Sequence, residues 1–288
     1  WTQTEGDWLI IGVPEGEELS GHLAGLDAAL DGTITRLLGS EDLKCKLGET
    51  LVIHDAQGIS AQRLLLVGLG SVEAIDRSRF ERAMMAATRT VATRRHVAAV
   101  YAIPEIKCEK LTPAVLAEVI SIACRVGSRG QDASKAEPSH FSLESATVLT
   151  SDENRPVVKD AVGRGVILGD AINLTRELVN ATAQEIHPES FAARAATVAQ
   201  GLGLTCEIMD QKRLEAEKMG SLLAVARGSV RPPRVVTIEY FGAGEDAPIL
   251  ALVGKGVTFD SGGLSIKPSE GMLTMKADMA GAATVLGA

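Results

Sequence analysis

Residues 64–103, LLLVGLGSVEAIDRSRFERAMMAATRTVATRRHVAAVYAI, hold two short apolar runs separated by a segment with helical periodicity. The runs at 64–69 and 97–103 have the unbroken apolar character of strands that are buried on both faces. Between the runs, apolar residues recur at helical spacing and share one face: Phe80, Ala83, Met84, Ala87 and Val91. A strand, a helix and a strand in this order predict an α/β fold with a mostly parallel sheet.

The same alternation continues downstream. Thr112 is typical of a helix N-cap, Pro113 of the first helical position and Gly127 of the residue that stops a helix. The polar segment GSRGQDASKAEPSH, residues 127–140, predicts an exposed loop. The run SATVLT, residues 145–150, then predicts another strand.

A long helix is predicted to follow. From Arg155 and Pro156 onward, apolar residues lie along one side of a segment that continues to Asn180, which corresponds to about six helical turns. An element of this length beginning next to a proline can bridge two domains. We therefore expect an N-terminal α/β domain over residues 1–152, a linking helix over 153–180 and a second domain over 181–288.

The second half of the chain is expected to alternate in the same way. Pro188 opens a helix, residues 204–209 form a strand, and a short helix runs from Asp210 to a stop at Gly220. Three apolar runs then read as strands, at residues 222–227, 234–240 and 249–254. This alternation also favours a mostly parallel sheet with helices on its faces.

Composition and charge limit the possible classes of function. The chain has 288 residues, of which 45% are hydrophobic, and a formal net charge of −8. The acidic balance argues against a nucleic-acid partner, and no apolar run approaches the roughly 18 residues that a membrane span needs. The four cysteines form no CxxC pair, which is typical of reduced thiols. We therefore expect a cytoplasmic protein that acts away from membranes.

The most informative loop is GKGVTFDSGG, residues 254–263, which follows the most apolar of the predicted strands. Loops at the carboxyl ends of strands are where open α/β sheets place their chemistry. A serine nucleophile at Ser261 would need a histidine base, and the G-x-S-x-G elbow is absent because Phe259 stands at its first glycine. A phosphate-binding loop would need an upstream glycine and a hydroxyl after the lysine. The third alternative is a metal site.

The metal alternative gains from the residues that follow. Two lysines and two aspartates, Lys255, Asp260, Lys267 and Asp278, lie between positions 255 and 278. The small apolar run after Asp278, AGAATVLGA, is suited to a helix packed closely on its neighbours. A purely structural alternative makes Asp278 a helix N-cap and Asp260 a turn former. That alternative leaves both lysines without a role.

These residues carry a resemblance to a known family. Residues 253–288 resemble the catalytic core of the leucyl (cytosol) aminopeptidases, two-metal enzymes that remove N-terminal residues from peptides. The sequence of this segment is VGKGVTFDSGGLSIKPSEGMLTMKADMAGAATVLGA. The segments GSVRPPRVVTIEY and LVNATAQEIHP, at 228–240 and 178–188, are also similar to that family. The resemblance implies a smaller N-terminal α/β domain and a C-terminal catalytic α/β domain with a mixed, largely parallel sheet.

The resemblance also implies roles for individual residues. It makes Lys255, Asp260 and Asp278 metal ligands, with Asp260 touching both metals. It makes Lys267 a catalytic lysine that polarises the scissile carbonyl, and it places Met275 in the pocket for the first side chain of the substrate. Lys255, Asp260 and Lys267 then also face the substrate. The implied cofactors are two divalent ions, Mn²⁺ or Zn²⁺, together with bicarbonate; the implied substrates are peptides, with a leucine-type residue preferred at the N-terminus, and the implied assembly is a homohexamer.

These roles require the two lysines to differ in protonation. A lysine can ligate a metal only when it is neutral, and its ordinary pKa near 10.4 must then be strongly lowered by the adjacent cations. The second lysine must remain charged to meet the negative charge that develops on the substrate. We therefore predict a neutral amine at Lys255 and an ammonium at Lys267.

The sequence departs from the family pattern in one large respect. The family's later Asn-Thr-Asp-Ala-Glu-Gly-Arg motif, which supplies two further carboxylate ligands and a catalytic arginine, does not occur in this sequence. Lys255, Asp260 and Asp278 provide too few oxygens to complete two metal shells. We therefore expect the 288 residues to be part of a longer protein and to be inactive alone. The alternative function is a non-catalytic relative that acts in binding or assembly, DNA binding included.

Overall fold

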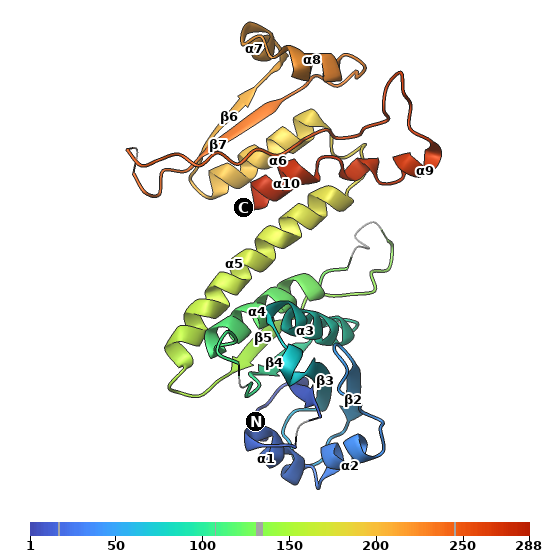
Figure 1. Cartoon of the computed structure of the whole chain (residues 1–288), viewed down its shortest axis with the longest axis vertical. Coiled ribbons are helices and arrows are strands. Elements are labelled where there is room, and N and C mark those ends of the chain that lie inside the picture. Colours follow the sequence, from blue (N-terminus) through green and yellow to red (C-terminus); the bar gives the residue numbers. More distant parts are fainter. Residues whose placement is uncertain (17, 107, 131–134, 245) are drawn as a thin grey trace. The chain divides into compact units, whose positions relative to one another are not determined.

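The computed structural model describes residues 1–16, 18–106, 108–130, 135–244 and 246–288, and it divides the chain into two compact units (Figure 1). Unit 1 comprises Trp1–Asn173 and unit 2 comprises Leu174–Ala288. The division falls inside the longest helix, α5, which runs over Arg155–Asn180 as the sequence predicts.

Unit 1 is built on a five-stranded sheet with the order β2-β3-β1-β4-β5. Its parallel strands are β1 (Trp8–Glu15), β3 (Arg63–Ser71), β4 (Ala98–Ala102) and β5 (Ser145–Leu149). The edge strand β2 (Thr50–His54) pairs antiparallel with β3. The predicted α/β class with a mixed, largely parallel sheet is therefore confirmed, and β3, β4 and β5 fall on the predicted runs. The sequence reasoning did not identify β1 and β2.

Helices cover both faces of this sheet (Figure 1). Because side chains alternate along a strand, Trp8 and Ile10 pack among residues of α3 (Arg77–Val91) and α4 (Pro113–Gly127). Leu9 and Ile11 pack on the opposite side, among residues of α1 (Gly21–Ala29) and α2 (Thr33–Gly39). A short 3-10 helix, η1 (Val72–Ala74), follows β3.

Local sequence signals account for the ends of these helices. The side chain of Thr112 accepts a hydrogen bond from Val115 N, which confirms the predicted N-cap of α4, and Gly127 is the last residue of that helix. Asp76 caps α3 by accepting from Arg79 N. In the predicted loop at 127–140, residues 131–134 lie outside the described residues, and the others after Gly127 form neither helix nor strand.

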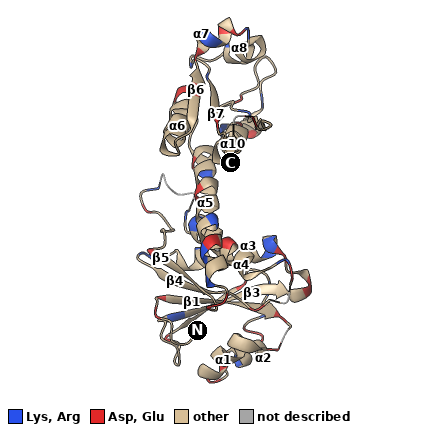
Figure 2. Cartoon of the chain, turned by 90° about the vertical axis from the view of Figure 1, so that its left-hand side faces the viewer, with Lys and Arg blue, Asp and Glu red and all other residues tan. Residues whose placement is uncertain are grey.

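Close backbone approach and paired charges join α5 to α4 within unit 1. A Cβ atom added at Gly165 would lie 2.4 Å from Glu118 O, so the two helices approach each other as only glycine allows. The Glu118 carboxylate pairs with Arg77 at 2.7 Å and with Arg164 at 3.1 Å. Burial raises the pKa of Glu118, but the two guanidinium groups together lower it below its ordinary value. Figure 2 shows the acidic and basic residues along α5.

Unit 2 has a smaller sheet, in which β6 (Thr205–Met209) pairs antiparallel with β7 (Val235–Glu239). Its helices, besides the end of α5, are α6 (Pro188–Gly201), α7 (Gln211–Ala216), α8 (Gly220–Ala226), α9 (Ser269–Met272), η2 (Met275–Ala277) and α10 (Ala280–Gly287). The predicted strands at 204–209 and 234–240 and the helix opened by Pro188 are confirmed. The parallel arrangement expected for this half is not found among its described strands.

Three predictions for unit 2 are wrong. The run at 222–227 lies mostly in α8, because leucine and alanine favour a helix as much as a buried strand. Gly220 accordingly begins α8 and does not end α7. The run at 249–254 forms no strand, since a strand requires a hydrogen-bonded neighbour and none of the described residues provides one.

Among the described residues, every helix is too short or too polar to cross a membrane.

Candidate metal centre

The loop at 254–263 is attached to α10 by its backbone. Ala282 N donates a hydrogen bond of 2.9 Å to Lys255 O. A Cβ atom at Gly254 would lie 2.4 Å from Gly281 O, so this approach requires a glycine in the loop. The small residues of α10 therefore bring the loop against the helix, in agreement with the close packing that the sequence indicates for AGAATVLGA. This contact brings Lys255 to the segment that carries Asp278.

Two ion pairs connect the four charged residues that the sequence singles out. Lys255 Nζ lies 2.9 Å from Asp278 Oδ2, and Lys267 Nζ lies 2.9 Å from Asp260 Oδ2. The charges of Asp278 and Asp260 both act on Lys255, and those of Lys267 and Lys255 both act on Asp260. The structure thus brings all four predicted residues into one cluster of alternating charge.

The charges change the proton affinity of two members of the cluster. Close contact with the Asp278 carboxylate raises the pKa of Lys255, and burial opposes this only in part. The bond from Lys267 lowers the pKa of Asp260, and the bond from Gly262 N to Asp260 Oδ1, 2.8 Å long, adds to this. Lys255 is therefore an ammonium in the chain alone, and its neutral form stays a prediction for the metal-bound protein.

The remainder of the loop positions Lys267 and Met275. Lys267 N donates to Ser261 O at 2.9 Å, which closes the loop between them. Gly262 adopts a φ of +102°, a backbone conformation that side chains other than hydrogen rarely allow. Lys267 Nζ also lies 2.9 Å from Met275 Sδ. The predicted catalytic lysine and the predicted pocket residue therefore meet directly.

The structural alternatives account for one aspartate only. Asp260 does act as a turn former, since its Oδ1 accepts from Gly262 N two residues later. Asp278 does not cap α10, because the N-cap is Met279 and no side chain there accepts a backbone hydrogen bond. Within the described ranges no hydrogen bond joins Ser261 to a histidine, so the serine-nucleophile alternative gains no support.

The available donors suit part of a metal site. Asp278 Oδ2 is buried and, apart from the Lys255 ammonium, has no hydrogen-bond partner among the described residues. A buried carboxylate oxygen in that state favours a cation beside it. Carboxylate oxygens suit Mn²⁺ and Zn²⁺, and a deprotonated amine adds a nitrogen donor. The described residues hold no group of three or more His, Cys, Asp or Glu that could bind a metal, so these ligands form an incomplete set.

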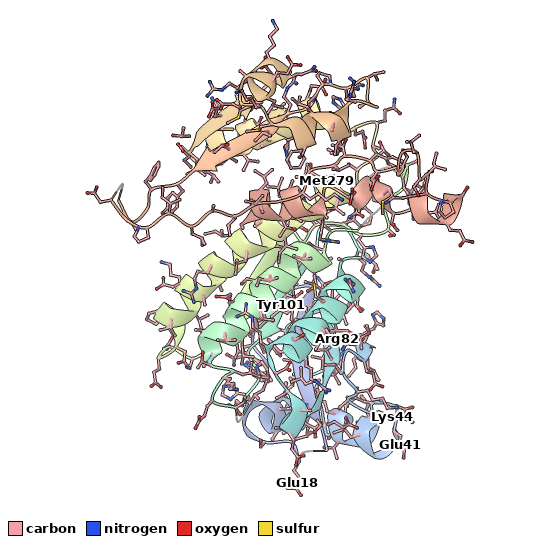
Figure 3. All side chains as sticks on the ribbon, turned by 45° about the horizontal axis from the view of Figure 1, so that its top comes forward. Glu18, Glu41, Lys44, Arg82, Tyr101 and Met279 are labelled. Carbon is pink, nitrogen blue, oxygen red and sulfur yellow. The ribbon has the colours of Figure 1, made fainter. Side chains whose placement is uncertain are left out.

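The sequence reasoning missed the residues that hold this cluster in place. Lys276 Nζ donates a 2.6 Å hydrogen bond to Asn180 O, the carbonyl of the last residue of α5. Met279, labelled in Figure 3, is fully buried and packs with Leu178 and Ala283. Both contacts join segments about a hundred residues apart, so no local signal in the sequence could have revealed them.

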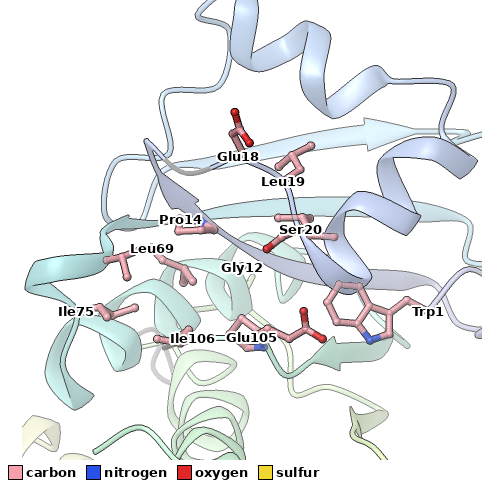
Figure 4. A pocket seen from close by; sticks show the side chains of 13 residues that line it. Trp1, Gly12, Pro14, Glu18, Leu19, Ser20, Leu69, Ile75, Glu105 and Ile106 are labelled. Carbon is pink, nitrogen blue, oxygen red and sulfur yellow. The ribbon is translucent and has the colours of Figure 1, made fainter. Parts of the chain in front are cut away.

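Unit 1 has a small cavity at the carboxyl ends of its parallel strands (Figure 4). Its lining includes Gly12 and Pro14 of β1, Leu69 of β3 and Glu105 after β4. The cavity has a volume of about 40 Å³, which is enough for one or two water molecules and far below that of a ligand pocket.

Comparison with known proteins identifies similar proteins over almost the whole chain. Residues 10–135 match the model for the N-terminal domain of the cytosol aminopeptidase family, and residues 173–288 match the model for its catalytic domain. Probable cytosol aminopeptidases from Burkholderia lata and Burkholderia cenocepacia are each 35% identical over 285 residues. Each alignment covers 98% of this chain and 57% of the relative.

Solved structures show the same similarity. The bottromycin maturation enzyme BotP in complex with Mn superposes with a TM-score of 0.76 at 29% identity, over 98% of this chain and 55% of that one. A variant of tomato leucine aminopeptidase superposes with a TM-score of 0.80 at 27% identity, over 99% of this chain and 56% of that one. The chain thus spans little more than half the length of the proteins it matches.

Proposed function

Because the chain belongs to the cytosol aminopeptidase family, we propose that it provides the N-terminal domain and the first part of the catalytic domain of a metal-dependent aminopeptidase. Its reaction would be hydrolysis of the N-terminal residue of a peptide, with a leucine-type residue preferred. The observation that carries this proposal is the cluster of Lys255, Asp260, Lys267 and Asp278, in which two lysines pair with two carboxylates and one carboxylate oxygen, Asp278 Oδ2, is buried.

The cluster divides into ligands and a substrate-facing lysine. Lys255, Asp260 and Asp278 would hold two divalent ions, which supply Lewis acidity and lower the pKa of a bound water. The Mn bound to the related BotP supports manganese, and Zn²⁺ is the second candidate. A bound cation would also favour the neutral amine of Lys255, since it disfavours a second positive charge beside it. Further ligands and bicarbonate would come from parts of the family sequence that this chain does not match.

Lys267 and Met275 would act on the peptide. The Lys267 ammonium is held by Asp260 at 2.9 Å and can donate to the scissile carbonyl as negative charge develops on its oxygen. Met275 contacts the same ammonium through Sδ, so an apolar first side chain on Met275 would set the carbonyl next to Lys267. The adaptable thioether of Met275 suits a leucine-type side chain.

We also propose that the complete protein acts in the cytoplasm as a homohexamer. The cytoplasmic location is supported by the names of its relatives, and the hexamer by the family resemblance alone. The overall acidic charge of −8 supports a peptide substrate over a nucleic acid.

An activity assay on a fusion protein, called the extended protein below, tests the proposal. The chain is assayed with leucine amide and Mn²⁺, both alone and extended by the part of the Burkholderia lata relative that it does not match. We expect turnover by the extended protein only, and its loss in the Lys267→Met variant. If the extended protein binds Mn²⁺ and hydrolyses nothing, the non-catalytic binding function replaces the enzymatic one.

A further inference from the structure

A lysine that the proposed reaction does not use lies close to the candidate ligands. Lys276 comes two residues before Asp278 and directly after Met275. Its ammonium does not join the charged cluster, because Nζ donates to Asn180 O at 2.6 Å. By charge alone, a cation at this position would weaken the binding of metal ions nearby. Favourable electrostatics with the metal ions therefore does not explain why a lysine stands at position 276.

The acceptor of Lys276 explains the position. Asn180 is the last residue of α5, and the carbonyl groups of the last helical turn have no partner within the helix. They carry the negative end of the helix dipole, where a lysine ammonium is favoured. Lys276 therefore caps the C-terminus of α5, and its ammonium forms no ion pair with the cluster carboxylates within the described ranges.

Two further contacts join the same stretch of α5 to the segment that carries Asp278. Met279 is fully buried against Leu178, and Thr175 Oγ1 donates to Ala283 O at 3.1 Å. Lys276 and Met279 thus stand on either side of Asp278 in the sequence, and both are fixed to the end of α5.

We propose that Lys276 is a positioning residue for the metal centre, which acts by capping α5 and thereby holding Asp278 in place against Lys255. This inference rests on the proposed function, because it takes Asp278 to be a metal ligand. Residues that orient metal ligands without contacting the metal themselves change the affinity for the metal by about 10- to 100-fold. Lys276 differs from such groups only in that it works through the backbone turn between itself and Asp278.

The direction in which one substitution changes Mn²⁺ affinity distinguishes the positioning role from a purely electrostatic one. In the Lys276→Met variant of the extended protein described above, the positioning role predicts Mn²⁺ binding about tenfold weaker, measured by titration calorimetry. A purely electrostatic role predicts tighter binding, since a nearby positive charge has been removed. Lys276→Arg should restore the wild-type affinity, because a guanidinium can also donate to helix C-terminal carbonyls. Lys212→Met on α7 is the matched control, an exposed lysine of unit 2 that should leave affinity unchanged.

Hydrogen exchange of the metal-free chain gives a second measurement. The amides of Ala282 and Ala283 donate to Lys255 O and Met279 O. In Lys276→Met both should exchange faster than in the wild type, and in Lys212→Met they should not. If Lys276→Met loses its native circular dichroism spectrum, Lys276→Gln takes its place in both measurements.

The outcomes distinguish this inference from the proposed function. Equal or tighter Mn²⁺ binding by the Lys276→Met variant, or unchanged exchange at Ala282 and Ala283, overturns the positioning role and leaves the proposed function intact. A wild-type extended protein that binds no Mn²⁺ overturns both. Weaker binding with faster exchange, restored by arginine, supports both.

Discussion

The two units bury their apolar residues to very different extents. In unit 1, strands β1 and β3 are covered on both faces, and residues such as Leu66 and Phe80 are fully buried. In unit 2, the loop around the metal centre exposes large apolar side chains, with Val253 at 92% and Leu264 fully exposed. Among the described residues of unit 1, the large apolar side chains that are exposed all lie on α5.

This difference in apolar burial separates the unit that stabilises the chain from the unit that carries the charged cluster. Burial of apolar area is the main favourable contribution to folding, so unit 1 holds most of the stability that the chain can have. Unit 2 carries the charged cluster on a surface that its own residues leave uncovered. Exposed apolar surface of this kind marks a place where more polypeptide is expected to bind. Substitutions in the two units should therefore affect different measurements.

The largest effect is expected from the core of unit 1. Phe80→Ala removes a fully buried ring and should lower the free energy of unfolding by about 3–5 kcal/mol. Trp1 and Trp8 are the only tryptophans of the chain, so the fluorescence of tryptophan during chemical denaturation reports unit 1 selectively. Leu264→Ala in unit 2 is the control and should change the free energy of unfolding, measured by circular dichroism for both variants, by less than about 0.5 kcal/mol. Similar losses in both variants would mean that the two units do not differ in this way.

The next effect concerns the metal centre and should leave unit 1 unchanged. Asp278→Asn removes the charge of a candidate ligand and should weaken Mn²⁺ binding about 100-fold, which corresponds to about 2.7 kcal/mol. The denaturation midpoint measured by tryptophan fluorescence should stay at the wild-type value. Glu270→Gln, a neutralised acid on the short helix α9, is the matched control for loss of one negative charge. If both variants bind Mn²⁺ like the wild type, Asp278 is not a ligand.

The elements of unit 1 could largely be predicted because their signals are local. The apolar runs of β3, β4 and β5, the helical face of α3 and the cap at Thr112 all lie within a few residues of the structure that they specify. The central strand β1 was missed although its register pairs Leu9 with Leu64 and with Val100. Its place in the middle of the sheet comes from these pairings, which link distant parts of the chain.

Unit 2 shows the limits of such signals. The runs at 222–227 and 249–254 are both strongly apolar, but the first is mostly helical and the second forms neither helix nor strand. Apolar composition alone does not separate a strand from a helix, and a strand depends on what lies beside it. For the site, the sequence indicated which charged residues belong together. It could not indicate that Lys255 pairs with Asp278 and Lys267 with Asp260, since those pairs arise only when the loop folds onto α10.

A smaller effect tests the close packing of helices in unit 1. Gly165→Ala places a Cβ atom 2.4 Å from the backbone oxygen of Glu118, so α5 must move away from α4 at a cost of about 1–3 kcal/mol. Gly163→Ala is the matched control in the same helix, because an added Cβ there meets nothing within 4 Å. That variant should be stabilised by about 0.5–1 kcal/mol, the usual gain from glycine to alanine in a helix. Equal midpoints for the two variants in tryptophan fluorescence would show that α5 does not pack on α4 in this way.

The smallest effect is a dependence on pH in the same part of unit 1. Glu118, paired with Arg77 and Arg164, has a folded-state pKa below its ordinary value of 4.5, so its ionised form stabilises the fold. This contribution is fully present above pH 4.5 and is lost as the pH falls through the lower folded pKa. Glu118→Gln should therefore destabilise unit 1 by about 1 kcal/mol at pH 7.

The difference between wild type and Glu118→Gln should then shrink as the pH falls below 4.5 and through the lower folded pKa, because the protonated carboxyl of the wild type no longer pairs with the arginines. Denaturation midpoints followed by tryptophan fluorescence across this pH range provide the measurement. Glu81→Gln on α3, which forms no ion pair among the residues that the structure describes, controls for the general effect of removing an acid. A difference that stays constant with pH would show that Glu118 acts through packing and not through its charge.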